Sequence, residues 1–433
     1  MGIRLISHAA SLHSFIIITD NGWPMPFTHV LYKMKKNLLT ALQLFCICLS
    51  FGVFSCSSDI IRLYNREISY SYSNPENAFL DHIVAGNIIM AMTFVEDKIV
   101  NINCTDSYKR TGLMYAAQYG HIGIVEYLFL RNANANLQDH RGSTALILAV
   151  ENNKPVIVQY LLKNTTNAAL QDFFGNTALM IAVKRQFNNI VKLLAADPAV
   201  LPVADNYGDT SLLLSFKNGY MTTAEILINT GKFSNEKDQK GRSALMLTLY
   251  YKYLNLVPLL IKNGSNLNYQ DNNGQTALML AIYYKYYNIV PLLIDNGSDV
   301  NIQDNNGQTA LMLAIYYKCY NLVPLILKKE RNINIQDTNG QTALMLATYY
   351  GHYDIVSLLI KAGCDLNIQD NDGQTALIKA VDTNNYYIVE LLLQSGANIE
   401  ISDNSNKDAL TTAKENDNKS ISKLIMEHKN KKI

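Results

Sequence analysis

"GQTALMLA" occupies residues 274–281, recurs at 307–314 and again at 340–347, and a fourth copy, "GQTALIKA", follows at 373–380. Successive copies start 33 residues apart. Repetition of the same residues at a fixed spacing is typical of a structural unit that stacks on copies of itself. Catalytic sites are not built from many copies of one short stretch. The stretch therefore predicts a repeat array.

Aspartate, glycine and leucine mark the same period along most of the chain. An aspartate occurs at every thirty-third residue from Asp106 to Asp403, and a leucine follows seven residues after each one, from Leu113 to Leu410. Glycine stands three residues after the aspartate in the eight units with Gly142 to Gly373, whereas Lys109 and Asn406 take that place in the first and last units. No insertion disturbs the register, so we expect units of equal size.

One unit, "DNNGQTALMLA" at 271–281, resembles the consensus D-x-x-G-x-T-P-L-H-x-A of ankyrin repeats. Ala277 stands where the family has proline, and Met279 where it has histidine. The resemblance covers roughly residues 76–428. It implies an all-α repeat solenoid of stacked ankyrin repeats, each a helix-turn-helix with a β-turn tip, with about ten to eleven units including the caps.

The repeat period also sets the expected boundaries of the array. We expect an N-terminal cap repeat at 76–105, nine 33-residue repeats at 106–402, and a C-terminal cap with a basic tail at 403–433. Neither helix of a unit can bury its apolar stripe alone, and stacking of neighbouring units buries both.

Local signals place the two helices of each unit. Thr276 precedes the apolar run "ALMLAI" and is expected to cap the first helix by accepting a backbone N–H. Asn288 is expected to cap the second helix, which puts Pro291 at the third helical position, where its missing N–H has no helical partner in any case. The same arrangement is expected for Asn255 with Pro258 and for Asn321 with Pro324.

Residues 34–58, "MKKNLLTALQLFCICLSFGVFSCSS", resemble the signal peptide of a bacterial lipoprotein. Two lysines precede an apolar stretch, 38–54, which suits a signal-peptide core and is short for a membrane span of about 20 apolar residues. Ser55 and Cys56 end the segment like a lipobox, although Phe54 stands where a small or β-branched residue is commoner.

In lipoproteins the peptide is cut before the cysteine, which is then lipidated. The resemblance thus implies a signal peptide at 34–55, lipidation of Cys56, and a membrane-associated, extracytoplasmic location. An uncleaved membrane anchor, a secreted protein or a buried helix are the alternatives. Residues 56–75 are expected to form a polar tether. Residues 1–33 show no sustained pattern, and we interpret them as an extension from a misplaced start codon or as a real N-terminal arm.

Composition and motifs argue against several classes of function. The formal net charge is +1 and no long block of Lys and Arg occurs, which is not the footprint of a nucleic-acid-binding protein. The six cysteines and eight histidines show no zinc-binding spacing and no disulfide framework. HExxH, GxSxG, a P-loop and a strand-linked GxGxxG are all missing from the sequence. We therefore expect a non-enzymatic protein with no cofactor, no metal and no small-molecule substrate.

Four successive units carry a pair of tyrosines at positions twelve and thirteen after the unit aspartate. In ankyrin repeats these positions and the turn tips contact protein partners, and tyrosine offers a large contact area at low entropic cost. The predicted partner-binding residues are Tyr250, Tyr251, Tyr283, Tyr284, Tyr316, Tyr317, Tyr349 and Tyr350, with Asn272, Asn273, Asn305 and Asn306 at the tips.

A second explanation is that recent duplication copied the tyrosines with the unit, some of them packing against the next unit. Earlier units carry other residues there, such as Glu151 with Asn152 and Lys184 with Arg185. The sequence thus favours a lipid-anchored, protein-binding scaffold. An effector whose array binds a host protein, a structural envelope spacer and, least favoured, an enzyme are the alternatives.

Overall fold

The computed structural model describes residues 4–6, 16–18, 24–26, 74–164, 166–329 and 332–431. The chain divides into two compact units, residues 1–140 and residues 141–433. The predicted signal peptide, lipidation site and nearly all of the predicted tether lie outside the described residues.

The first unit contains a small antiparallel sheet and two helix pairs. The strands are β1 (Arg4–Ile6), β2 (Ile16–Ile18) and β3 (Pro24–Pro26), in the order β1-β2-β3. This sheet lies in the N-terminal segment, where the sequence pattern had indicated no element. The helices are α4 (Pro75–Val84), α5 (Ile88–Glu96), α6 (Gly112–Tyr119) and α7 (Ile122–Leu130). Helix α4 begins after Asn74, whose side chain accepts the N–H of Asn77, so the end of the expected tether already belongs to the first helix pair.

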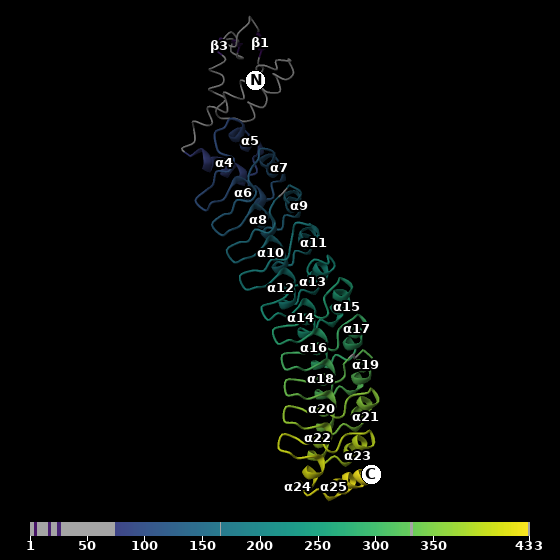
Figure 1. Ribbon diagram of the computed structural model, residues 1–433. Helices are drawn as coiled ribbons and strands as arrows, with labels where there is room; N and C mark the ends of the chain where they lie inside the picture. The colour runs from purple at the N-terminus through teal and green to yellow at the C-terminus, as the bar shows by residue number, and fades with distance from the viewer. Residues whose placement is uncertain are drawn as a thin grey trace. The chain divides into compact units, whose positions relative to one another are not determined.

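The described residues of the second unit form nine helix pairs, in which even-numbered helices come first and odd-numbered helices second (Figure 1). Each even-numbered helix packs against the next even-numbered one and against its own partner. The helices are α8 (Ala145–Glu151), α9 (Pro155–Lys163), α10 (Ala178–Lys184), α11 (Asn188–Ala196), α12 (Ser211–Lys217), α13 (Met221–Ile228), α14 (Ala244–Tyr250), α15 (Val257–Lys262), α16 (Ala277–Tyr283), α17 (Ile289–Asp295), α18 (Ala310–Tyr316), α19 (Val323–Leu327), α20 (Ala343–Tyr349), α21 (Tyr353–Lys361), α22 (Ala376–Asp382), α23 (Tyr386–Gln394), α24 (Ala409–Glu415) and α25 (Lys419–Lys431).

The repeated aspartate and glycine build the turn that precedes each first helix. The Asp304 carboxylate accepts the backbone N–H groups of Asn306 and Gln308, both at 2.9 Å. Gly307 has φ +74°, and a Cβ at this position would lie 2.7 Å from the backbone nitrogen of Thr338 in the next turn. Glycine is therefore needed both for the left-handed backbone and for close stacking of successive turns.

The expected cap of the first helix is confirmed, and the expected cap of the second is wrong. Thr276 accepts the N–H of Met279 at 3.3 Å. Asn288 precedes α17, but its side chain makes no capping hydrogen bond. In two other repeats, short 3₁₀ turns, η3 (Leu254–Leu256) and η4 (Tyr320–Leu322), come before the helix and contain Asn255 and Asn321. A proline lies three residues after each of these asparagines, and its nitrogen carries no hydrogen for the asparagine side chain to accept. The helix is therefore not capped at this point, and its first turn takes the tighter 3₁₀ form.

Candidate partner-binding surface

The eight predicted tyrosines lie at the C-terminal ends of four stacked first helices and are here called the tyrosine row. The first tyrosine of each pair is the last residue of α14, α16, α18 or α20, and the second is the C-cap. Each helix ends here because the next residue has a left-handed backbone, with φ between +58° and +71°. These residues are Lys252, Lys285, Lys318 and Gly351.

None of the eight side chains is fully buried. The first tyrosines, Tyr250, Tyr283, Tyr316 and Tyr349, are 48–58% exposed, and the second tyrosine of each pair is partly exposed. The rings are therefore not core residues, and solvent reaches the first tyrosine of each pair most freely.

Ring contacts connect the row within and between repeats. Tyr283 meets Tyr284 edge-on with centroids 5.0 Å apart, and it meets Tyr317 of the next repeat in the same way at 5.2 Å. Tyr316 contacts Tyr317 at 5.0 Å and Tyr350 at 6.0 Å. Edge-to-face pairs of this kind are favourable beyond the area they bury. The contacts fix the orientation of the exposed rings, so the second tyrosines also help to join the repeats, as the duplication explanation allowed.

A second set of aromatic residues, which the sequence analysis missed, supports the row from behind. Tyr284 stacks on Tyr286 at 5.5 Å, and the Tyr286 hydroxyl donates to the carbonyl of Leu249 in the preceding repeat. Tyr251 stacks in the same way on Tyr253, whose hydroxyl donates to a carbonyl of the repeat before it. The recurrence of an aromatic residue two positions after the second tyrosine is the sequence signal for this support.

Crowding changes the acidity of the less exposed rings. Burial first, and then neighbouring tyrosines, raise the pKa of Tyr284, Tyr317 and Tyr350 above the ordinary value. These hydroxyls stay protonated at neutral pH and remain able to donate hydrogen bonds.

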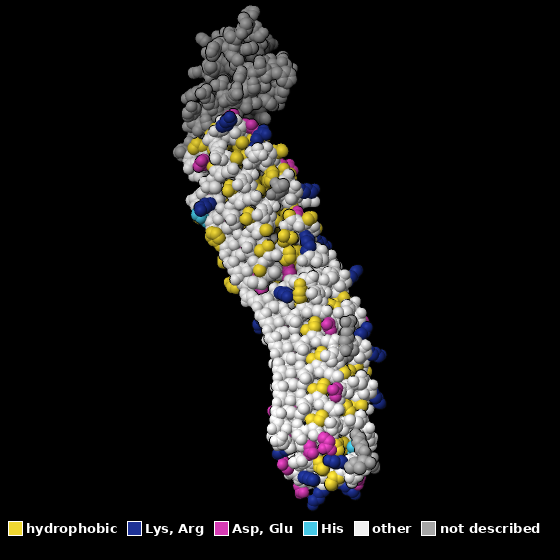
Figure 2. Space-filling model, in the orientation of Figure 1, with side chains coloured by type: hydrophobic (Ala, Val, Ile, Leu, Met, Phe, Trp, Pro, Cys, Tyr) yellow, Lys and Arg dark blue, Asp and Glu magenta, His cyan; other side chains and the backbone are white. Residues whose placement is uncertain are grey.

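The predicted tip asparagines divide into two kinds. Asn305 donates from its side chain to the carbonyl of Asn272 at 2.9 Å, and Asn272 donates in turn to Gln239. These two residues tie successive turns together and have a structural role. Asn273 and Asn306 are exposed, and only their backbone groups take part in the hydrogen bonds described for the turns. Figure 2 shows the turns of these repeats as an almost uncharged surface.

A family model for ankyrin repeats matches this chain in eight overlapping segments that together run from residue 81 to residue 433. This chain belongs to the ankyrin repeat family. Among solved structures, it is similar to the ankyrin repeat domain of Bcl-3, described as a unique member of the IkappaB protein family. The identity is 25%, the match covers 51% of this chain and 99% of that chain, and the TM-score is 0.45. A comparison with curated proteins found no match.

Membership confirms the predicted solenoid and the general class of function. Ankyrin repeats are typically non-enzymatic scaffolds that mediate protein–protein interaction. Among the helices of the described residues, none is both long and apolar enough to cross a bilayer. The predicted lipid anchor lies in the undescribed part of the chain.

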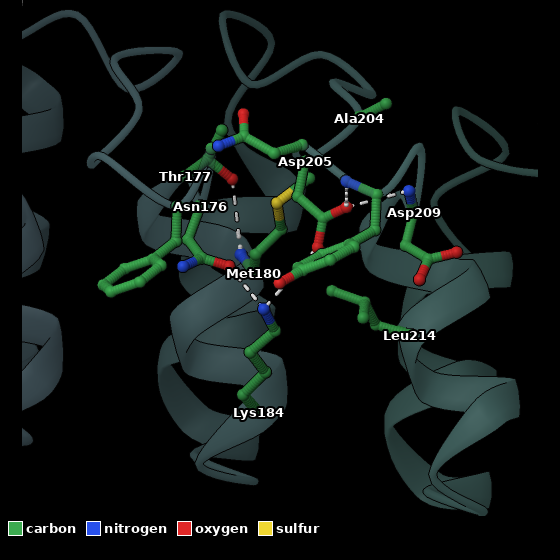
Figure 3. Close-up of polar contacts among 12 residues, drawn as sticks. Asn176, Thr177, Met180, Lys184, Ala204, Asp205, Asp209 and Leu214 are labelled. Carbon is green, nitrogen blue, oxygen red and sulfur yellow. Dashed lines mark hydrogen bonds and ion pairs between the residues drawn. The ribbon is translucent and has the colours of Figure 1, made fainter.

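The earlier ankyrin repeats place charged groups where the later ones place the tyrosine row. Lys184, at the position of the first tyrosine, reaches from α10 to the side-chain oxygen of Asn176 and lies 3.6 Å from Asp205, the aspartate of the next repeat (Figure 3). Asp205 also accepts the N–H groups of Tyr207 and Asp209. A shallow depression of about 220 Å³ lies beside Lys184, with Arg141, Phe174 and Arg185 among its lining residues. Paired tyrosines at these positions are thus confined to the four repeats that begin at Asp238, Asp271, Asp304 and Asp337.

Proposed function

We propose that this ankyrin array is a protein-binding scaffold, that the tyrosine row is its contact surface, and that a lipid on Cys56 holds it to a membrane outside the cytoplasm. The observation that supports the contact surface is the set of half-exposed rings at the ends of α14, α16, α18 and α20, held by edge-to-face contacts. Rings that are already ordered lose little conformational entropy when a partner binds, so more of the contact energy remains as affinity.

Binding is tested by capture of partners from envelope extracts on the full-length chain. The double variant Tyr283→Ser with Tyr316→Ser removes two first tyrosines. The matched control is Tyr287→Ser with Tyr353→Ser, because these tyrosines are similarly exposed, at 44% and 47%, but lie at the starts of second helices. Loss of a buried aromatic anchor commonly costs about 2 kcal/mol, or about 30-fold in affinity.

The proposal expects the first double variant to lose capture and the control to keep it, with unchanged circular dichroism in both. Equal capture by the two variants would contradict the assignment of the tyrosine row. Absence of any captured protein would favour the structural spacer.

Anchoring is tested separately by mass spectrometry of the mature N-terminus and by fractionation. Cleavage and acylation at Cys56 are expected in the membrane-bound form, and Cys56→Ala should leave a larger, unacylated precursor. An intact peptide that spans Ser55 and Cys56 in the membrane fraction would exclude lipidation. Recovery in the secreted fraction would favour a delivered effector.

A further inference from the structure

The charge around the tyrosine row is one-sided. Between Gln239 and Ile294, and again between Asn305 and Lys329, the only acidic residue is Asp271. The unit aspartates of this region, Asp271, Asp304 and Asp337, are at most partly exposed, and each accepts two backbone N–H groups of its own turn. No exposed carboxylate therefore lies in these turns or on the first helices beside the row, and the charges at the C-terminal ends of these helices are cationic.

In the first three of the four repeats of the row, a lysine directly follows the tyrosine pair. Lys252, Lys285 and Lys318 are exposed, and they form no ion pair within the described residues. All three have left-handed backbones, with φ +65°, +58° and +60°, a conformation that is easier for glycine. Glycine does occupy the equivalent place in two other repeats of the second unit, as Gly219 and Gly351.

The spacing of the row restricts the conformation of a bound chain. The ring centroid of Tyr283 lies 5.0 Å from that of Tyr284 and 5.2 Å from that of Tyr317. Tyr284 and Tyr317 are equivalent residues of neighbouring repeats, so their rings are at most about 10 Å apart. This agrees with the usual separation of packed helices. A polyproline II helix has three residues per turn and advances about 9 Å per turn. A β-strand presents the same face every two residues, after about 7 Å, and an α-helix every turn, after about 5.4 Å. Two turns of an α-helix advance about 10.8 Å, which slightly exceeds the limit of about 10 Å set by the ring contacts. One turn of a polyproline II helix lies just within this limit and therefore fits the spacing of the repeats best.

The chemistry of the row also suits such a segment. Proline rings pack on aromatic faces, and a polyproline II backbone has no internal hydrogen bonds, so its carbonyl groups are open to donors. The protonated hydroxyl groups of the row supply donors along its length. In the three repeats with Lys252, Lys285 and Lys318, one lysine per repeat matches one carboxylate per turn of the bound chain.

We infer that the tyrosine row binds an extended, proline-rich, acidic peptide segment in the polyproline II conformation, with an acidic residue at every third position. This inference rests on the proposed function, because it names the kind of partner that occupies the same surface.

The test uses the full-length chain and fluorescein-labelled synthetic peptides. The probe is (Pro-Pro-Glu)₅. Its controls are (Gly-Gly-Glu)₅, which keeps the charge and its period without the polyproline conformation, (Pro-Pro-Lys)₅, which reverses the charge, and a shuffled peptide with the composition of the probe. Affinity is measured by fluorescence anisotropy at about 50 and 200 mM salt, since attraction between exposed charges weakens with ionic strength.

The probe should bind at least about tenfold more tightly than every control peptide. Replacement of Lys252, Lys285 and Lys318 by Gln should weaken binding about tenfold and reduce its salt dependence, and Tyr283→Ser with Tyr316→Ser should weaken it as much. The control variant with Tyr287→Ser and Tyr353→Ser should bind like the unmodified chain.

Equal affinity for the probe and (Gly-Gly-Glu)₅ would overturn the polyproline assignment, and equal affinity for the probe and the shuffled peptide would overturn the three-residue period. Failure of the probe to bind, while tyrosine-dependent capture from envelope extracts persists, would reject this partner chemistry and leave the proposed function intact. Capture that does not depend on the tyrosine row would reject the proposed function itself.

Discussion

Glu236 should make the stability of one repeat depend on pH. Its side chain is 8% exposed and lies beside Thr210, whose hydroxyl donates to one carboxylate oxygen, while the other oxygen has no hydrogen-bond partner. No cation forms an ion pair with it among the described residues. The five later repeats have Tyr269, Ile302, Ile335, Ile368 and Ile401 at the equivalent position.

Burial is the main cause that raises the pKa of Glu236 from 4.5 to about 8, and the hydrogen bond from Thr210 opposes it. Below pH 4.5 the carboxyl group is protonated in both the folded and the unfolded state, so its ionisation does not reduce the stability of the repeat. Between pH 4.5 and 8 only the unfolded state releases the proton, so stability falls as the pH rises. A tenfold change in proton affinity is worth about 1.4 kcal/mol, and the total loss is therefore on the order of 5 kcal/mol.

The perturbation is Glu236→Gln, which keeps the shape of the side chain and removes its ionisation. The free energy of local opening of residues 205–237 is measured by hydrogen exchange in both proteins at the same pH, so intrinsic exchange rates cancel. The free energy of local opening should be larger in the variant than in the unmodified chain, by less than about 1 kcal/mol at pH 5 and by about 4 kcal/mol at pH 7.5. Glu225→Gln, on the exposed face of α13, controls for the loss of one negative charge.

A difference between Glu236→Gln and the unmodified chain that stays constant from pH 5 to pH 7.5 would refute this reasoning. A variant that is less stable than the unmodified chain at pH 7.5 would refute it as well, because burial of a charged carboxylate would then be compensated in some other way.

Further predictions concern other repeats. Amide exchange should be faster at residues 205–235 than at 271–370, because the former bury polar side chains such as Ser215 between helices, and equal protection would contradict this. Gly307→Ala should lower the urea midpoint more than Gly264→Ala, with a free energy of unfolding that is lower by about a further 1–3 kcal/mol. Both glycines have a left-handed backbone, but only at Gly307 would an added Cβ contact the next turn. Tyr350→Ser should reduce thermal stability by about 1 kcal/mol more than Tyr349→Ser, since only Tyr350 contacts a ring of the preceding repeat, and equal losses would argue against a joining role.

Most of the fold could be predicted because its determinants are local. The unit aspartate accepts N–H groups two and four residues later, as at Asp304, and Thr276 accepts an N–H three residues later. Such interactions lie within one short stretch of sequence and recur every 33 residues, so the period, the turn and the first helix follow from the residues alone. The start of the second helix was predicted less well, because a proline near the helix start is compatible with an α-helical or a 3₁₀ first turn. The structure has the 3₁₀ form in η3 and η4.

The sequence also placed the tyrosine pairs at a contact position, but it could not say how far each ring is exposed. The edge-to-face contact of Tyr283 with Tyr317 and the hydrogen bond from Tyr286 to Leu249 join residues more than 30 positions apart. The sequence by itself determined the repeat, its turn and its first helix, through contacts inside one unit. Only the tertiary structure decided which tyrosines are most exposed to solvent, which asparagines join successive turns, and that Glu236 is buried. The reason is that burial depends on the side chains that a neighbouring repeat brings to the interface.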